Sequence, residues 1–126
     1  MRILLDTHIF LWSIDNHSRL TPPMKEIMLS AEQIFVSSVS IWEIAIKINI
    51  GKLQGDMQDI VKAIDNSNFI ELPMTVAHAA KIHSLPNYHS DPFDRMLIAQ
   101  AMTEPLKLLT VDSKFEEYSD LIILFN

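Results

Sequence analysis

Four acidic residues lie far apart in the chain, and each stands where an apolar, strand-like run meets the start of a helix: Asp6, Glu43, Asp94 and Asp112. In open α/β sheets, ligands bind at the carboxyl ends of the parallel strands, so we expect these carboxylates to share one crevice. Gathered carboxylates repel each other unless a cation joins them. Hard divalent ions such as Mg²⁺ or Mn²⁺ prefer oxygen ligands. The pattern therefore predicts metal-assisted hydrolysis of phosphodiester bonds.

Asp6 and Glu43 each have a structural alternative. Asp6 follows the apolar run Ile3–Leu5 and can cap the next helix by accepting a backbone hydrogen bond. Ser40 and Glu43 have the spacing of a capping box, which favours a capping role on spacing alone. Lys47 stands four residues after Glu43, where it can form an ion pair or instead approach a substrate phosphate. Both alternatives stay open.

Asp94 lies in the first turn of a helix that begins at Asp91-Pro92. Asp91 suits the cap, and proline suits the first helical position. An acid in the first turn complements the helix dipole, but it also points toward the crevice expected for Asp6. We therefore predict that Asp91 is the cap and Asp94 the metal ligand. Arg95 is either a surface charge or a phosphate contact.

Asp112 closes the strand-like run 108–111. Ser113 and Glu116 have the spacing of a second capping box, so Asp112 is not needed as a cap and is predicted to be free for another task. The Thr110 hydroxyl is placed to hydrogen-bond an acid or a water at the metal site.

None of the five histidines has the paired spacing of metal ligands. His8, two positions after Asp6, and His89, just before Asp91, are candidates for the rim of the crevice. The other histidines are read as surface or packing residues. Trp12 is read as a core residue or a dimer contact.

The bulk composition fits one soluble domain spanning residues 1–126. Apolar residues make up 48% of the chain, enough for a core. The absence of cysteine excludes disulfides and thiolate metal sites. No signal peptide or membrane-spanning run is evident, so a cytoplasmic location and no membrane partner are expected. The net charge of −6 argues against nucleic-acid binding, except where clustered acids hold metal.

Strand and helix patterns alternate along the chain. Such alternation predicts a parallel sheet with right-handed crossovers and helices on both faces. Strands are expected at 2–5, 34–37, 69–72, 107–111 and 121–125. Helices are expected at about 8–15, 21–31, 41–49, 56–66, 75–84 and 92–104.

These features together resemble a PIN-domain ribonuclease, specifically the toxin of a VapBC-type toxin–antitoxin pair. The segments that carry the resemblance are Leu4-Leu5-Asp6-Thr7-His8, Ser40-Ile41-Trp42-Glu43-Ile44-Ala45-Ile46-Lys47, Asp91-Pro92-Phe93-Asp94-Arg95-Met96-Leu97-Ile98-Ala99-Gln100-Ala101 and Thr110-Val111-Asp112. The second and third, in this order, are the specific ones. The resemblance covers essentially the whole chain.

The resemblance implies a three-layer α/β/α sandwich around a central parallel sheet. It implies a homodimer that cleaves RNA with Mg²⁺ or Mn²⁺, and an antitoxin protein that blocks the acidic site. The family's acids map onto Asp6, Glu43, Asp94 and Asp112, and its hydroxyl maps onto Thr110. Many members carry a basic residue where this chain has Val111, which is expected to weaken substrate contact there.

Two alternatives come from other classes. A small phosphoryl-transfer domain of the receiver type needs an acidic pair near the first strand, and Asp6 has no acidic neighbour. A non-catalytic PIN-like module would use the same acidic crevice only to bind a basic segment of a partner. Metal titration separates such a module from a nuclease.

Overall fold

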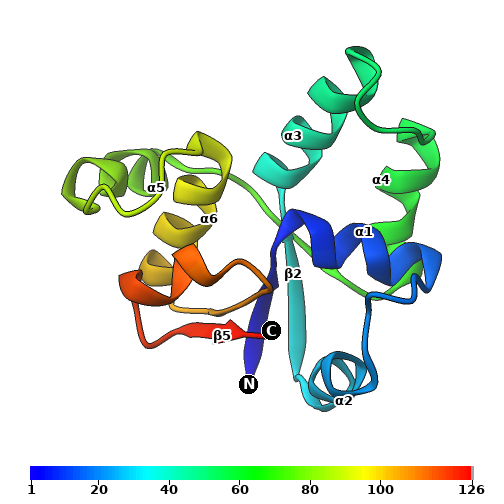
Figure 1. The fold of residues 1–126 in the computed structure, drawn as a ribbon, viewed down its shortest axis with the longest axis horizontal. Helices are drawn as coiled ribbons and strands as arrows, with labels where there is room; N and C mark the ends of the chain where they lie inside the picture. The colour runs from blue at the N-terminus through cyan, green and yellow to red at the C-terminus, as the bar shows by residue number, and fades with distance from the viewer. Residues whose placement is uncertain (126) are drawn as a thin grey trace.

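The computed structural model describes residues 1–125, which form a five-stranded, fully parallel sheet with helices on both faces (Figure 1). The strand order is β3-β2-β1-β4-β5. The strands are β1 (Arg2–Leu5), β2 (Gln33–Ser37), β3 (Ile70–Leu72), β4 (Lys107–Thr110) and β5 (Ile122–Leu124). The predicted α/β class and parallel sheet are confirmed.

The helices connect successive strands. They are α1 (Thr7–Asp15), α2 (Pro22–Ser30), α3 (Ser38–Asn49), α4 (Met57–Asn66), α5 (Val76–Lys81) and α6 (Pro92–Thr103), with short 3₁₀ helices η1 (Ile82–Ser84) and η2 (Ser113–Tyr118). None of the helices within residues 1–125 has the length and hydrophobicity that crossing a bilayer requires.

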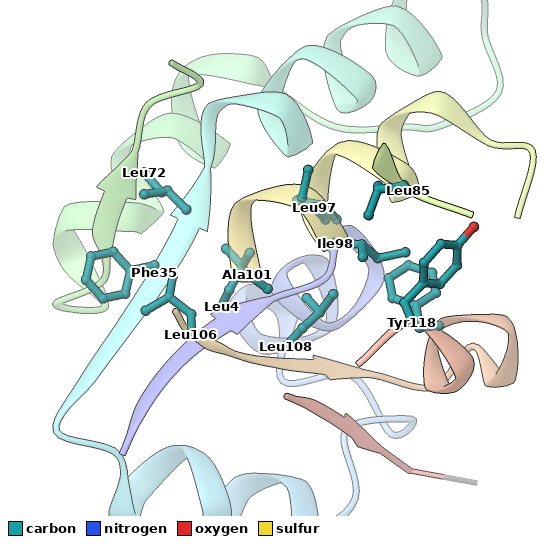
Figure 2. Close-up of a cluster of buried hydrophobic side chains, with 12 residues drawn as sticks. Leu4, Phe35, Leu72, Leu85, Leu97, Ile98, Ala101, Leu106, Leu108 and Tyr118 are labelled. Atoms are coloured by element: carbon teal, nitrogen blue, oxygen red, sulfur yellow. The ribbon is translucent and has the colours of Figure 1, made fainter. Parts of the chain in front are cut away.

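Two hydrophobic clusters cover the two faces of the sheet, because successive side chains of a strand point to opposite faces. In β1, Leu4 joins the cluster formed with α6 and η2, which Figure 2 shows. Its neighbours Ile3 and Leu5 join the cluster formed with α1 to α4. All three are fully buried. The central strands are therefore apolar on both sides, as a sheet between two helical layers requires.

Most predicted elements lie where the sequence pattern places them, with two differences. The helix expected at 41–49 begins three residues earlier, at Ser38, because Ser37 and not Ser40 is its cap. The segment 113–118, for which a helix start was expected but no bounds were predicted, forms the 3₁₀ helix η2. Both differences concern residues beside the acidic crevice.

Candidate metal and phosphodiester site

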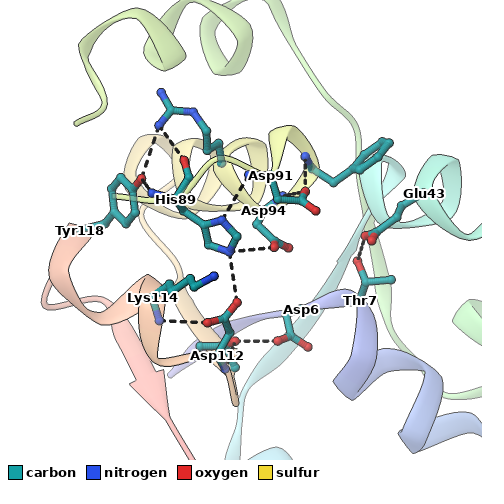
Figure 3. A network of polar contacts seen from close by, with 12 residues as sticks. Asp6, Thr7, Glu43, His89, Asp91, Asp94, Asp112, Lys114 and Tyr118 are labelled. Atoms are coloured by element: carbon teal, nitrogen blue, oxygen red, sulfur yellow. Dashed lines mark hydrogen bonds and ion pairs between the residues drawn. The ribbon is translucent and has the colours of Figure 1, made fainter. Parts of the chain in front are cut away.

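The acidic crevice lies at the carboxyl ends of the neighbouring strands β1 and β4. Asp6 directly follows β1, and Asp112 lies two residues after the end of β4. Glu43 enters from α3 and Asp94 from α6. Figure 3 shows the four carboxylates around a common space. The topology thus brings together all four acids singled out in the sequence.

Asp6 is a helix cap and also faces the crevice. Its Oδ1 accepts a hydrogen bond of 2.8 Å from the backbone N–H of Ile9, which caps α1. Its Oδ2 accepts one of 2.6 Å from the Thr110 hydroxyl. The side chain is almost completely buried, and this burial raises the pKa of Asp6, although both hydrogen bonds oppose the rise. The two readings of Asp6 are therefore compatible.

Glu43 is a buried acid in the interior of α3, and the capping box predicted for it with Ser40 is wrong. Ser37 caps α3 by accepting from the N–H of Val39, so Glu43 lies in the second turn. Its Oε1 accepts a hydrogen bond of 2.8 Å from Thr7. Its Oε2 pairs with Lys47 at 2.8 Å. Both carboxylate oxygens of Glu43 are thus held in place at the edge of the crevice.

Asp94 has a pKa that burial and nearby carboxylates raise strongly. Asp91 caps α6, as predicted, by accepting from the N–H groups of Phe93 and Asp94. Burial raises the pKa of Asp94 from its ordinary 3.8 to about 7. Repulsion from nearby carboxylates adds to the rise, in decreasing order from Asp91, Glu43, Asp6 and Asp112. A group with this pKa is partly protonated at neutral pH unless a cation joins it.

Asp112 caps a helix and faces the crevice at once. The predicted Ser113–Glu116 capping box is wrong, because Asp112 itself caps η2 through an Oδ1 bond of 2.9 Å from the N–H of Lys114. Its Oδ2 points the other way, toward His89 at 3.1 Å. One oxygen is used by the fold, and the other is available to the site.

His89 bridges two of the acids. Its Nε2 lies 3.1 Å from Asp94 Oδ2 and 3.1 Å from Asp112 Oδ2. Its Nδ1 accepts a hydrogen bond of 3.2 Å from the backbone N–H of Asp91. Because Nδ1 is an acceptor, the proton of the neutral ring belongs on Nε2, where it is donated to the two carboxylates. His89 therefore joins this acid pair through one shared hydrogen-bond donor.

The loop that carries His89 is fixed by Arg95 and Tyr118. The backbone N–H of His89 donates to the Tyr118 hydroxyl at 2.7 Å. The Nη1 of Arg95 donates to the carbonyl oxygens of Pro86 and His89, at 2.9 and 3.3 Å. Arg95 thus anchors this loop, and the phosphate contact predicted for it stays a prediction. The same holds for Lys47, which is half-exposed and paired with Glu43.

The donor set fits a hard divalent cation. One ligand atom each from His89, Asp94 and Asp112 lies within 4.8 Å of the others. Asp6 and Glu43 add carboxylate oxygens nearby. Carboxylate-rich sites suit Mg²⁺ or Mn²⁺ better than zinc, which favours nitrogen and sulfur. The raised pKa of Asp94 shows a concentration of negative charge that a cation would relieve.

His89, Thr7 and Tyr118 shape the site but were not predicted as site residues. His89 was a candidate only for the rim, and its contacts with Asp94 and Asp112 come from residues on α6 and after β4. The Thr7 hydroxyl donates to Glu43 and accepts from the Ser40 hydroxyl at 2.9 Å. The adjacency of Thr7 to Asp6 was the one local signal available. Nothing local marks Tyr118, because its partners lie in another loop.

Comparisons with known proteins agree with this arrangement. The family profile described as PIN domain matches residues 3–121. No curated protein sequence matches the chain. VapBC2 from Rickettsia felis, bound to a DNA fragment from its promoter, has a similar fold: TM-score 0.71, 20% identity, covering 100% of this chain and 98% of that chain.

Two further complexes have the same fold. DNA-bound VapBC from Salmonella typhimurium matches with a TM-score of 0.68 and 16% identity, over 99% of this chain and 97% of that chain. A toxin–antitoxin complex from Klebsiella pneumoniae matches with a TM-score of 0.67 and 15% identity, over 96% and 95%. At these identities the likeness concerns the fold.

Proposed function

This chain belongs to the PIN-domain family, and on that premise we propose that it is a metal-dependent endoribonuclease acting as the toxin of a toxin–antitoxin pair. The observation that carries the proposal is the convergence of Asp6, Glu43, Asp94 and Asp112 on one crevice. Burial, with added repulsion from Asp91 and from the other three crevice carboxylates, raises the pKa of Asp94 to about 7. A fold gains nothing from such crowding, so a cationic ligand is its most direct explanation.

The proposed roles follow from how each side chain is held. Asp6 and Asp94 are the direct ligands of Mg²⁺ or Mn²⁺, with Asp112 as a further ligand or the holder of a water. A bound divalent ion supplies Lewis-acid chemistry, because it lowers the pKa of water and stabilises negative charge on phosphate oxygens. Thr110 fixes Asp6 through its 2.6 Å hydrogen bond. Glu43, paired with Lys47 at 2.8 Å, is a ligand or the general base.

The substrate would be RNA, with Lys47 and Arg95 orienting phosphates at the rim. Lys47 is half-exposed, so its ammonium group is within reach of a substrate. A substrate phosphate could share this ammonium group with Glu43, because Lys47 has three N–H donors. The same acidic crevice would attract a basic segment of the antitoxin, which would block it.

An apolar hollow between α3 and α6 supports the proposed homodimer. Its volume is about 350 Å³, and Trp42 and Phe93 meet edge to face within it at 5.0 Å. Trp42 is 57% exposed and Met74 is 46% exposed. Covering side chains of this size removes apolar surface from water, which favours association. A cytoplasmic location would fit this pairing and RNA cleavage.

The test is cleavage of a cellular RNA pool by the purified protein with Mg²⁺, with Mn²⁺ and with EDTA. Asp6→Asn and Asp94→Asn should each nearly abolish cleavage while their circular dichroism spectra stay unchanged. Asp65→Asn, a change at an exposed acid of α4, is the matched control and should cleave normally. Full activity in both crevice variants would refute the assignment.

No cleavage under any metal condition, by protein shown to be free of a bound partner, would refute the nuclease. The acidic crevice would then be a non-catalytic binding site for a basic segment.

A further inference from the structure

A second hollow lies beside the acidic crevice, between α1, the segment that precedes α2, and the residues that follow β4 and β5. Its volume is about 620 Å³, and its walls include Trp12, Arg19, Val111 and Phe125. This size is in the range of small-molecule sites, about 300–1,000 Å³. Among the described residues, Arg19 is the only charged side chain in the wall. The proposed catalytic roles use none of these four residues.

The hollow and the acidic crevice are formed in part by consecutive residues of the chain. Val111 stands between Thr110, which donates to Asp6, and the crevice acid Asp112. Trp12 lies six residues after Asp6 along α1, a rise of about 9 Å at 1.5 Å per residue. Two to three stacked nucleotides span about the same distance, at roughly 3.4 Å each. A strand cut at the acids would therefore reach the hollow within about two to three nucleotides.

Trp12 is an aromatic surface surrounded by basic side chains. The Arg19 guanidinium lies 6.0 Å from its ring centroid. His17 stacks on the indole at 6.2 Å with an interplanar angle of 25°, and His8 approaches it at 6.2 Å. His8, His17 and Arg19 are exposed, while Trp12 is half-buried. Arg19 is at the outer limit of the cation–π range, about 6 Å, so it is free to move to a phosphate.

The charges distinguish this hollow from the one on the other side of Trp12. The hollow on that other side, of about 480 Å³, has His8 and His17 in its walls together with Asp15, Asp56 and Asp59, whose carboxylates repel phosphate. The Arg19 side includes no acid among its described wall residues. In a chain with a net charge of −6, a cationic and aromatic surface next to the acids is the part suited to a nucleic acid.

We propose that the hollow formed by Trp12, Arg19, Val111 and Phe125 binds one base of single-stranded RNA. The base stacks on Trp12, and Arg19 moves to a neighbouring phosphate. This inference rests on the proposed ribonuclease function and adds a substrate subsite to it. The apolar Val111, in the wall of the same hollow, suits the edge of a base.

A packing role accounts for only part of Trp12. Trp12 contacts the cluster that contains Ile3 and Leu5, and this contact explains its buried edge. It does not explain why the side chains of Arg19, His8 and His17 all lie near the Trp12 ring. Stacking on an aromatic ring accepts any base, whereas the phosphate contact supplies the attraction that depends on salt.

The experiment uses tryptophan fluorescence, since the chain has only two tryptophans. In a Trp42→Phe, Asp94→Asn protein, all tryptophan emission comes from Trp12 and cleavage is disabled. Labelled single-stranded RNA oligonucleotides of mixed sequence are titrated, and anisotropy reports binding independently. We expect binding to quench Trp12. Because a stacked base contributes about 1–3 kcal/mol, Trp12→Ala should weaken binding by about 5- to 150-fold and Trp12→Phe by much less.

Arg19 is tested with a matched control of equal charge. In the same background, Arg19→Ala should weaken binding and reduce the slope of log affinity against log salt by about 0.7, the value for one phosphate on a single strand. Lys62→Ala removes an exposed charge on α4 and should change neither quantity. Equal effects of the two substitutions would overturn the phosphate contact.

The outcomes separate this inference from the proposed function. If RNA binds by anisotropy but Trp12 emission does not change, or if RNA does not bind at all, the base subsite is refuted. If the base subsite is refuted in this way but the wild type cleaves RNA, the nuclease proposal still stands. The hollow would then be a binding site for a protein partner. If RNA quenches Trp12 but the wild type never cleaves, the subsite stands and the nuclease proposal fails.

Discussion

The Thr110 hydroxyl donates a hydrogen bond of 2.6 Å to Asp6 Oδ2, across 104 positions of sequence. The Thr110 hydroxyl oxygen also accepts a hydrogen bond of 3.0 Å from the backbone N–H of Asp112. One buried hydroxyl therefore sets the orientation of one crevice acid and the backbone of another. It can do so because β1 and β4 are paired neighbours whose carboxyl ends meet.

Removing this hydroxyl should impair both metal use and stability. Thr110→Val leaves Asp6 without the hydrogen bond that opposes the rise in its pKa. We expect a 10- to 100-fold loss in metal affinity or activity, roughly the effect of losing a group that orients a ligand. The free energy of unfolding should fall by about 1–3 kcal/mol. Cleavage rate against Mg²⁺ concentration and urea unfolding measure the two effects.

Thr110→Ser is the matched control, because it keeps the hydroxyl and should retain most of the metal response. If the serine variant behaved like the valine variant, packing of the lost methyl group and not the hydrogen bond would be responsible.

The raised pKa of Asp94 predicts how stability depends on pH when metal is removed. An unfolded aspartate ionises near its ordinary pKa of 3.8, whereas folded Asp94 keeps its proton until about pH 7. Between these values the folded state binds more protons than the unfolded state. The free energy of unfolding contributed by Asp94 therefore falls as pH rises from about 4 to about 7. It stays lowered above that range.

Asp94→Asn should remove this dependence. In EDTA, the variant and the wild type should be similarly stable near pH 4, and the variant should be increasingly more stable as the pH rises to 8. Saturating Mg²⁺ should stabilise the wild type most at pH 8, where Asp94 is ionised. Thermal unfolding across this pH range measures the difference. A stability gap that did not grow with pH would contradict the assigned environment of Asp94.

The architecture was predictable because its signals are local and repeated. Apolar runs such as Ile3–Leu5 alternate with helix patterns, and a parallel sheet necessarily gathers residues that follow its strands. From the sequence spacing alone, the carboxylates of Asp6 and Asp94 could therefore be expected to lie in one crevice. Their detailed environments could not, because hydrogen bonds such as that of Thr110 join residues distant in sequence.

The capping error at α3 has a physical cause. Ser37 and Ser40 both precede or begin the same helix, and the capping-box pattern cannot choose between them. The choice is made by the sheet, because Ser37 still pairs with Leu72 at the end of β2 and the helix begins directly afterwards. Ser40 then turns inward to Thr7. Tertiary contacts thus decide which of two equally suited serines is the cap.

Gln100 offers a test of a purely structural contact. It is fully buried on α6, and its Oε1 accepts a hydrogen bond of 2.6 Å from the Ser37 hydroxyl. Gln100→Leu fills a similar volume but leaves Ser37 without this partner. We expect the free energy of unfolding to fall by about 1–3 kcal/mol, with the Mg²⁺ dependence of cleavage unchanged. Gln58→Leu, at an exposed position of α4, should stay within about 0.5 kcal/mol of the wild type.

The contacts of His89 lead to a prediction that tells whether His89 acts as a hydrogen-bond donor or as a metal ligand. Its Nε2 faces Asp94 and Asp112 at 3.1 Å each, while Nδ1 accepts from the backbone. His89→Ala removes the donor and leaves the two carboxylates to repel each other. In EDTA, the free energy of unfolding should fall by about 1–3 kcal/mol. Mg²⁺ should then stabilise the variant more than it stabilises the wild type, because the cation replaces the lost bridge.

His83→Ala is the control, since His83 is exposed and should be within about 0.5 kcal/mol of the wild type. Thermal unfolding of all three proteins with EDTA and with increasing Mg²⁺ gives the comparison. A smaller stabilisation of His89→Ala than of the wild type would mean that His89 coordinates the metal directly. In that case its ring would have to give up the hydrogen bond from Asp91 and carry its proton on Nδ1.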